Sequence, residues 1–396
     1  MANICCCWEL GAGVGHVVNL LPIAHELRKR GHKIKWIIPA ATQASDLLTK
    51  ENFDISILPI NRPVGAIAAP KTFAEILCGV GYLDPINLTA AVARWRTSFI
   101  EFQADLIITE YAPTALLASK SLRLSSVKLG PSFTFPPPQT PMPSFRIWEK
   151  VAQSKLGSLE KKVLSTVNQV LEHFQVEQIS NLYLMLQTND TFLTTFPEFD
   201  EYGKRTDTEY LGTPASYSGG ATVNWPTAEG KKVFAYLKSD FDNLISTLEA
   251  LGSTFLPTVV CVLGASQTLV ELYSRPQLKV VNYLVDFNDV IDNADVVIAH
   301  GTGTIAAALL AGIPTITLAM NIEQHIRGRI AQQLAVGSNY SSAQSSGTLV
   351  ETVLAIVNND AYKMHARNFA QKYSDYNQST LTARISDRCE KILAQV

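Results

Sequence analysis

The chain has 396 residues, of which 47% are hydrophobic and 17% charged, and its formal net charge is −2. This length predicts two domains, and the apolar fraction is sufficient for a core in each. The weak net charge and the lack of a basic stripe argue against a nucleic-acid partner. No apolar run reaches the roughly 18–20 residues that span a bilayer, and the N-terminus lacks a secretion-signal pattern. We therefore expect a cytoplasmic protein without an integral membrane segment.

The N-terminal half opens with a strand, a glycine-rich loop, a helix and a second strand. An apolar run at residues 3–8 predicts the first strand, and the loop occupies residues 9–16. Residues 17–30 show helical apolar spacing with basic residues in the last turn, and Gly31 follows as the stop. Residues 34–38 predict the second strand. Such a unit is typical of a parallel sheet with right-handed crossovers.

This first loop does not suit a nicotinamide or flavin dinucleotide. Its glycines run G-x-G-x-G-H, not G-x-G-x-x-G, and the second strand ends at Ile38-Pro39 where a ribose-binding acid is expected. Cys5, Cys6 and Cys7 are adjacent, which suits neither a disulfide framework nor a zinc site. We interpret these cysteines as small apolar residues of a buried strand.

The remainder of this half continues the alternation of strands and helices. Further strands are predicted at residues 55–58, 106–109 and 127–129. Residues 130–143 interleave six prolines with Phe133 and Phe135, so we expect them to cross the surface. They form either a stiff connector or one wall of a pocket for an apolar partner. Residues 149–187 are predicted to be mostly helical, with a break at Gly157.

A shift to Gly, Ser, Thr and Pro between Gly212 and Pro226 predicts a linker between two domains. Beyond it, strands are predicted at residues 232–237, 258–263, 279–283, 296–299 and 315–318. Helices are predicted at residues 240–251, 326–334, 348–358, 361–373 and 381–393. The expected organisation is a domain at residues 1–212, a linker at 213–230, a domain at 231–376 and a C-terminal helix at 377–396 that packs back on the first domain.

Residues 295–324 combine a buried strand, a glycine turn, an uncharged alanine–leucine helix and a second apolar strand. The first N–H groups of such a helix point to the space above the strand's carboxyl end, where they and the helix dipole attract an anion. Gly301 and Gly303 permit close approach of a ligand, and Thr302 and Thr304 either cap the helix or contact a phosphate. Spacing alone leaves a capped turn and an anion site equally open.

Two motifs resemble the GT-B nucleotide-sugar glycosyltransferases, and more narrowly the UDP-glycosyltransferase-like family. In the first half, Gly13-Val14-Gly15-His16 and the helix that follows resemble the family's glycine–histidine loop. In the second half, residues 300–304, 311–314 and Glu323-Gln324 resemble its donor signature. The resemblance implies an α/β GT-B fold, with two Rossmann-like, doubly wound parallel-sheet domains facing each other across a cleft. It also implies that the first domain binds the acceptor and the second the nucleotide sugar.

For the first motif, the resemblance implies that His16 is the general base for the acceptor hydroxyl. Imidazole titrates near neutral pH, which suits this role. Glu110 stands where the family usually has a shorter aspartate that orients the histidine. The alternative is that His16 is a loop residue that caps the following helix. Phe133, Phe135 and Trp148 are the candidate acceptor-binding residues.

For the second motif, the resemblance implies that His300 contacts the donor phosphates and that residues 301–304 hold the diphosphate. Ser239 stands where the family has a small residue near the β-phosphate, although capping a helix at Asp240 explains Ser239 equally well. Asp240 and Asp242 form an Asp-x-Asp pair, which we interpret as a helix-start feature because the family needs no metal ion.

The nucleoside and sugar ends of the donor have further candidates. Tyr283 stands roughly where many relatives stack a tryptophan on the base, and Glu323 and Gln324 match the pair that binds the donor sugar. Ala307 replaces a glutamate that commonly holds both ribose hydroxyls. We therefore hypothesise that a deoxyribose donor, such as a dTDP-sugar, is tolerated or preferred.

Taken together, the resemblance implies an inverting, metal-independent glycosyltransferase of the hexosyltransferase type. Its co-substrate is a UDP- or dTDP-linked sugar, it needs no other cofactor, and its acceptor is a small, partly apolar molecule with a hydroxyl group. Two alternatives stay open: a sugar-nucleotide epimerase of GT-B shape, and a catalytically silent GT-B binding or partner protein. The sequence does not determine the donor sugar, the acceptor or the oligomeric state.

Overall fold

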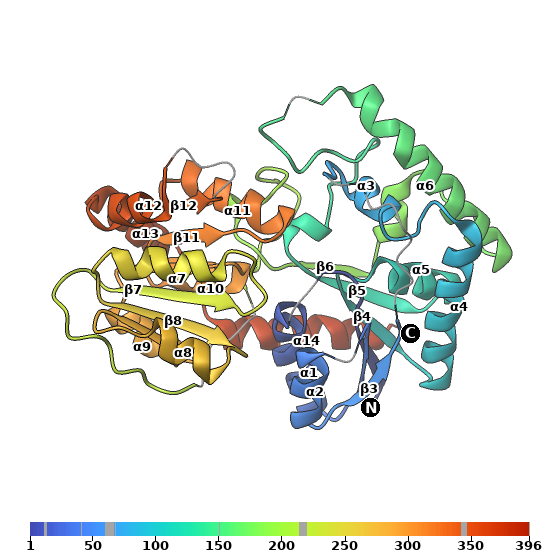
Figure 1. The fold of residues 1–396 in the computed structure, drawn as a ribbon. Coiled ribbons are helices and arrows are strands. Elements are labelled where there is room, and N and C mark those ends of the chain that lie inside the picture. Colours follow the sequence, from blue (N-terminus) through green and yellow to red (C-terminus); the bar gives the residue numbers. More distant parts are fainter. Residues whose placement is uncertain are drawn as a thin grey trace. The chain divides into compact units, whose positions relative to one another are not determined.

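The computed structural model describes residues 1–11, 14–40, 42–59, 67, 69–149, 151–213, 220–341 and 347–395. The chain divides into two compact units, Met1–Ala215 with Asn377–Val396, and Ser216–Tyr376. Each unit contains a six-stranded sheet with helices packed against it (Figure 1). The predicted α/β class with two parallel-sheet domains is therefore confirmed. Gly13 of the first motif and residues 214–219 of the predicted linker lie outside the described residues.

The first unit has the strand order β3-β2-β1-β4-β5-β6, and its five strand pairings are all parallel. The strands are β1 (Asn3–Trp8), β2 (Lys33–Ile38), β3 (Asp54–Ile57), β4 (Leu106–Glu110), β5 (Ser125–Gly130) and β6 (Asp190–Leu193). The central strands β1 and β4 are buried along almost their whole length, as expected for continuous apolar runs in a parallel sheet. Cys5, Cys6 and Cys7 are fully buried free cysteines, and burial raises the pKa of Cys5 to about 12. This agrees with an apolar, non-redox role for these side chains.

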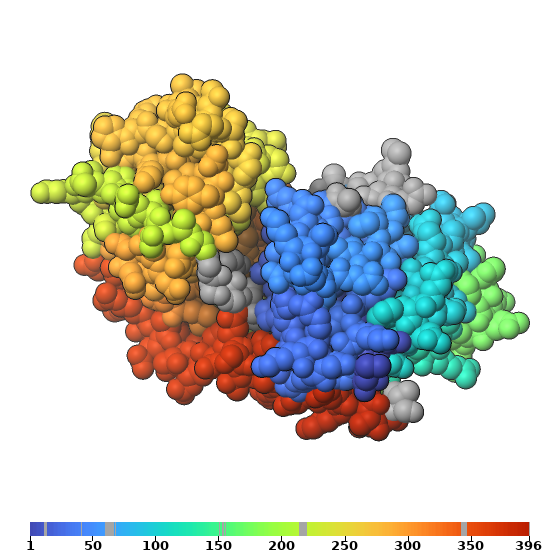
Figure 2. Space-filling view, turned by 90° about the horizontal axis from the view of Figure 1, so that it is seen from below, coloured from blue at the N-terminus to red at the C-terminus, as the bar shows by residue number. Residues whose placement is uncertain are grey.

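Seven α-helices of the described residues belong to this unit. They are α1 (Gly15–Lys29), α2 (Gln43–Lys50), α3 (Phe73–Cys78), α4 (Pro85–Glu101), α5 (Pro113–Leu122), α6 (Gln153–His173) and α14 (Gln378–Leu393). Helix α14 packs against α1, and Arg30 after α1 pairs with Asp387 and Glu390 of α14. Figure 2 shows the red C-terminal residues lying along the blue N-terminal residues. The last helix of the chain therefore completes the first unit.

Two sequence-based expectations for this unit are wrong. Gly157 lies inside α6 and does not interrupt it, since one glycine costs a helix only about 1 kcal/mol and α6 buries a long apolar face. Residues 131–136 of the proline-rich segment are buried and do not run over the surface. A short 3₁₀ turn at Ser132–Thr134 pairs their backbone groups internally, and the Ser132 hydroxyl donates to Glu201. Burial is possible because these polar groups are satisfied.

The second unit has the strand order β12-β11-β10-β7-β8-β9, also with parallel pairings. Its strands are β7 (Val233–Lys238), β8 (Thr258–Leu263), β9 (Leu278–Val281), β10 (Val296–Ala299), β11 (Thr315–Leu318) and β12 (Gly337–Tyr340). Its helices are α7 (Leu244–Ser253), α8 (Gln267–Tyr273), α9 (Phe287–Asn293), α10 (Thr302–Leu310), α11 (Ile322–Gln333), α12 (Leu349–Val357) and α13 (Asp360–Lys372). All ten predicted strands of the chain are present, with their ends displaced by at most two residues.

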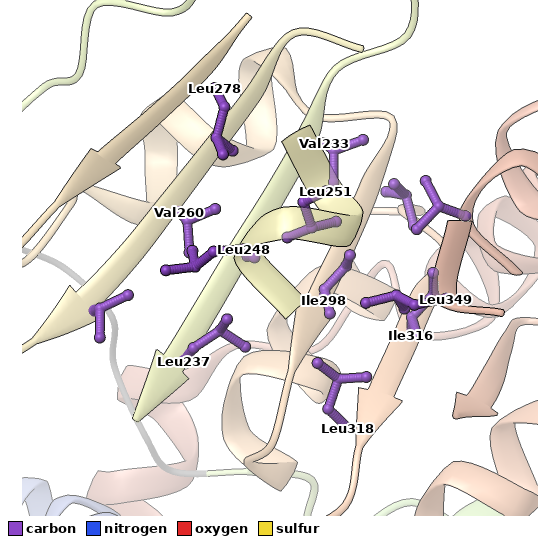
Figure 3. Packing of buried hydrophobic residues seen from close by; sticks show 14 of the residues in the cluster. Val233, Leu237, Leu248, Leu251, Val260, Leu278, Ile298, Ile316, Leu318 and Leu349 are labelled. Carbon is purple, nitrogen blue, oxygen red and sulfur yellow. The ribbon is translucent and has the colours of Figure 1, made fainter. Parts of the chain in front are cut away.

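The core on one face of this sheet forms where α7 crosses the strands. Figure 3 shows Leu248 and Leu251 of α7 over Val260 of β8 and Ile298 of β10. Both leucines are fully buried, and each such burial stabilises the fold by about 1.5–3 kcal/mol. Helix α7 begins at Leu244, not at Asp240 as predicted, because residues 238–243 form turns that carry the chain back over the sheet.

Among the helices that the structure describes, none is both long and apolar enough to cross a membrane. Within the same described ranges, no cluster of three or more His, Cys, Asp or Glu side chains is arranged to hold a metal ion.

Candidate active site

His16 is positioned by the turn between β1 and α1. It is the second residue of α1, whose N-cap is Val14, and no side chain caps this helix. The Nδ1 atom of His16 lies 2.6 Å from Oε2 of Glu110, the last residue of β4. Strands β1 and β4 are parallel neighbours with Trp8 opposite Glu110, so both strands end at the same edge of the sheet. The ring of His16 is therefore held by a carboxyl group and does not serve as the cap of α1.

The pair is well shielded from water. The side chain of His16 is 13% exposed and that of Glu110 is fully buried. The second carboxyl oxygen of Glu110, Oε1, is also buried and has no hydrogen-bond partner among the described residues. When Nδ1–H donates to the carboxylate, the neutral imidazole carries its lone pair on Nε2. This arrangement makes Nε2 the atom that accepts a proton, and the adjacent carboxylate stabilises the imidazolium that results.

Aromatic rings surround His16. Trp8 stacks on it with centroids 5.5 Å apart and planes at 18°, and the Tyr111 ring lies 5.9 Å away. Tyr111 also contacts Phe133, which packs on Phe145. Neither Trp8 nor Tyr111 was predicted as a site residue, although each directly adjoins a predicted strand end or a motif residue.

The three acceptor-side candidates differ in their surroundings. Phe133 and Phe135 are buried, and Trp148 is half-buried. Phe133 contacts Tyr111, which adjoins His16, whereas the Phe135 ring lies 4.8 Å from Nζ of Lys128. Burial, together with a smaller effect of the Arg205 charge, lowers the pKa of Lys128 to about 7. Phe133 thus contacts a ring that adjoins His16, and a Cβ built on Gly130 would lie 3.5 Å from both Oε1 of Glu110 and Cζ of Phe135, so both phenylalanines lie near the pair.

His300 follows β10 directly in the second unit. Its Nδ1 atom lies 2.5 Å from the carbonyl oxygen of Leu318 at the end of β11. A carbonyl only accepts, so the proton is on Nδ1 and the neutral ring has its lone pair on Nε2. The residue is 3% exposed, and Nε2 is buried without a hydrogen-bond partner among the described residues. Burial lowers the pKa of His300 and Lys238 acts in the same direction, whereas the hydrogen bond to Leu318 and the charge of Asp240 act against them.

The N-terminus of α10 adjoins this histidine. Its N-cap is Gly301, and no side-chain hydrogen bond caps the helix. A Cβ at Gly301 would meet no atom within 4 Å, so the space beside it is open. Thr304 is buried, while Thr302 and Gly303 are partly exposed. Uncapped N–H groups and the positive end of the helix dipole therefore adjoin the buried ring of His300, a combination that suits an anion.

The other donor candidates have mixed environments. Ser239 is exposed and does not cap α7, because that helix begins five residues later. Tyr283 follows β9 and is 40% exposed. Gln324 accepts a hydrogen bond from the backbone N–H of Met320 at 2.7 Å, an interaction at the start of α11. Glu323, in the first turn of α11, lies beside Arg327, with Oε1 4.0 Å from Nε.

Comparisons with known proteins agree with this geometry. Residues 258–379 match the glycosyltransferase family 28 C-terminal domain, and no curated protein matches the chain. The solved structure of CalG4, the calicheamicin glycosyltransferase, is 17% identical with a TM-score of 0.72, covering 100% of this chain and 99% of that one. The glycotransferase of kitacinnamycin is 16% identical with a TM-score of 0.70, covering 99% of each chain. VinC in complex with DTDP is 12% identical with a TM-score of 0.65, covering 97% of this chain and 100% of that one.

These findings define the class. The chain has the GT-B fold, and its resemblance to the GT-B nucleotide-sugar glycosyltransferases, predicted from the two motifs, is confirmed. The matched domain model indicates a glycosyltransferase.

Proposed function

We propose that the protein is an inverting glycosyltransferase that moves a hexose from a nucleoside-diphosphate donor to a hydroxyl group of a small, partly apolar acceptor. The observation that carries this proposal is the 2.6 Å contact between His16 Nδ1 and Glu110 Oε2. A buried carboxylate on Nδ1 selects the tautomer whose Nε2 is basic and stabilises the positive ring that forms when Nε2 takes the acceptor proton.

The leaving group is assigned to the second unit. The uncapped N-terminus of α10 and the Nε2 atom of His300 support a diphosphate site, because negative charge grows on the diphosphate as its bond to the sugar breaks. In this proposal the first unit binds the acceptor and the second binds the donor. Ser239 adjoins the phosphates, Tyr283 stacks on the base, and Glu323 and Gln324 bind the sugar hydroxyls.

The proposed reaction is a single displacement. The acceptor oxygen forms a bond to the anomeric carbon while the bond from that carbon to the diphosphate oxygen breaks, which inverts the anomeric centre. The acceptor proton passes to Nε2 of His16, and the electron pair of the broken bond stays on the diphosphate. Holding both reactants in line supplies much of the rate. The helix N-terminus and His300 supply the charge stabilisation, so the proposal routes no step through a metal ion.

We further propose that the donor nucleoside is a deoxyribonucleoside. The observation behind this is Ala307 in α10, a side chain that offers no hydrogen bond to ribose hydroxyls. The similar protein VinC was solved with DTDP, which supports the same choice. Calorimetric titration with dTDP and with UDP tests it: we expect tighter binding of dTDP, and clearly tighter binding of UDP contradicts it.

The function itself is tested with a panel of nucleotide sugars and acceptors. We expect His16→Ala to lower transfer at least about a hundredfold, with nucleoside-diphosphate binding unchanged in calorimetry. Unchanged turnover would remove His16 from the mechanism. Incubation with each donor alone is the control, because an isomerised sugar would indicate an epimerase. A lack of thermal stabilisation by every donor would favour a silent binding protein.

A further inference from the structure

Trp8 and Gly11, at the end of β1 and in the loop after it, lie against the His16 ring. Trp8 is 3% exposed, and its indole stacks on the imidazole with planes at 18°. The indole is itself fixed, because Nε1 donates to the carbonyl oxygen of Leu10 at 2.6 Å. One face of the imidazole is therefore covered by a ring that cannot easily rotate.

Gly11 lies beside the Nε2 edge of the His16 ring. A Cβ built on Gly11 would lie 2.2 Å from Nε2 of His16, 2.8 Å from Cε1 and 3.1 Å from Cδ2. The contact is thus closest at the nitrogen that receives the proton in the proposed reaction. Any side chain at this position would displace the imidazole or cover Nε2. The backbone of Gly11 also has φ of +88°, a region that other residues rarely adopt.

The segment from Trp8 to Gly11 is also tied to the residues that follow Glu110. The backbone N–H of Leu10 donates to the Tyr111 carbonyl at 2.9 Å, and Oε2 of Glu9 accepts from the backbone N–H of Thr114 at 2.7 Å. Tyr111 follows Glu110 directly, and Thr114 lies in the first turn of α5 shortly after it. A shift of Trp8 or Gly11 would therefore change the geometry of both members of the pair.

We propose that Trp8 and Gly11 are positioning residues for His16: Trp8 sets the plane of the imidazole, and Gly11 leaves the room beside Nε2 that any side chain would fill. The hydrogen bond from Nδ1 restrains one edge of the ring, and the stacked indole restrains its face. The catalytic consequence rests on the proposed function, whereas the position of the ring does not.

Gly11→Ala has a matched control in Gly31→Ala. Gly31 follows the C-terminal end of α1, the helix that carries His16. It has φ of +91° and would meet no atom within 4 Å if it carried a Cβ. The two variants share the backbone strain, and only Gly11→Ala meets His16. We expect Gly11→Ala to lower kcat about a hundredfold, as displacement of a reacting group by about 1 Å does. Donor affinity stays unchanged in Gly11→Ala, and Gly31→Ala keeps full kcat.

The second pair of variants is Trp8→Leu and Trp8→Phe. Leucine removes the stacked ring, and phenylalanine retains an aromatic face. We expect kcat to fall roughly tenfold in Trp8→Leu, as for a smaller displacement of the base, and to recover most of its value in Trp8→Phe. NMR of the His16 ring protons gives a readout independent of turnover: losing the indole ring current moves them downfield in Trp8→Leu.

The outcomes separate the two proposals. If the His16 resonances move in Trp8→Leu but His16→Ala keeps full turnover, the proposed function fails and the positioning of the ring stands. If His16→Ala is inactive while Gly11→Ala and Trp8→Leu keep full turnover, the positioning roles are overturned. Unmoved His16 resonances in Trp8→Leu also overturn them. If thermal unfolding shows that Gly11→Ala is not folded, the variants Trp8→Leu and Trp8→Phe test the proposal by themselves.

Discussion

His16 and His300 have the same hydrogen-bond arrangement, in which Nδ1 is held by an oxygen, but the oxygen belongs to different groups. In the first unit it is a carboxyl oxygen of Glu110 at 2.6 Å, and in the second it is the backbone carbonyl of Leu318 at 2.5 Å. Both partners select the tautomer with its lone pair on Nε2. The hydrogen bond to the Leu318 carbonyl favours a protonated His300 less than burial disfavours it, whereas a carboxylate brings a full negative counter-charge to a protonated ring.

The difference explains how one type of side chain suits the two roles that we propose for His16 and His300. His16 can become positive at low cost because its counter-charge is built into the protein, which suits a base. His300 is buried without such a partner, and burial lowers its pKa, so the ring is neutral when the site is empty. Its Nε2 then presents a lone pair, which repels phosphate oxygens. A bound diphosphate gains a hydrogen bond from His300 only if its negative charge favours uptake of a proton by Nε2.

The largest effect is expected when the negative charge of Glu110, which distinguishes the surroundings of the two histidines, is removed. Glu110→Gln keeps an oxygen that accepts from Nδ1–H but loses the counter-charge of the imidazolium. We expect kcat to fall about a hundredfold or more, by analogy with loss of the orienting carboxylate in a catalytic triad. Steady-state rates at saturating donor measure the effect, and calorimetry should show unchanged nucleoside-diphosphate affinity. Full turnover of Glu110→Gln would mean that the charge does not separate the two sites.

The second effect concerns stability, which should depend on pH with opposite sign in the two units. Burial raises the pKa of Glu9 from 4.5 to about 7. Because the folded-state pKa is the higher one, protonated Glu9 contributes stability that is fully present below pH 4.5 and is lost as pH rises to 7. The free energy of unfolding lost in this way is on the order of 3 kcal/mol. For His300 the folded-state pKa is lowered, so its contribution is present above about pH 6.5 and is lost as pH falls.

Denaturant unfolding at several pH values tests this contrast. Glu9→Gln should remove the loss between pH 4.5 and 7, and His300→Gln should remove the loss on acidification. Glu172→Gln, an exposed residue of α6, is the control with the same change of charge. Parallel pH profiles for wild type and Glu9→Gln would contradict the assignment to Glu9.

The third effect is on donor affinity. A hydrogen bond to a charged group contributes about 1.5–3 kcal/mol, so His300→Ala, which leaves no donor, should weaken nucleoside-diphosphate binding by roughly ten- to a hundredfold. His16→Ala should leave the same affinity unchanged, which is the asymmetry that the comparison requires. Calorimetric titration measures both variants. Equal losses in the two would show that the histidines do not have separate roles.

The smallest expected effect is the uptake of a proton when the diphosphate binds. Since His300 is neutral when empty and must be protonated to donate from Nε2, diphosphate binding should take up part of one proton near neutral pH, and affinity should fall as pH rises. Calorimetry in buffers of different ionisation enthalpy measures the uptake. Titration of the phosphates contributes in any variant, so the difference between wild type and His300→Gln isolates the histidine. Equal proton uptake in wild type and His300→Gln would contradict a proton-coupled role for His300.

Local pattern in the sequence was sufficient for most elements of both sheets. Apolar runs bounded by glycine and proline predicted ten strands, because buried parallel strands read as continuous hydrophobic segments. The neighbourhood of His300 and α10 is also local, since strand, turn and helix follow one another directly. Strands β6 and β12 were missed because they are short and carry polar residues, and α7 was started too early because Asp240 and Asp242 resemble a helix start.

Contacts between distant residues were decided by the tertiary structure. His16 and Glu110 lie 94 residues apart, and they meet because β1 and β4 are neighbours that end at one edge of the sheet. From the sequence, only the family resemblance suggested this pair. Leu318 reaches His300 because β10 and β11 are adjacent, and the contact of Gly11 with Nε2 depends on how the first loop folds back. Periodicity determines which residues form a strand, whereas strand order and register determine which side chains meet at its end.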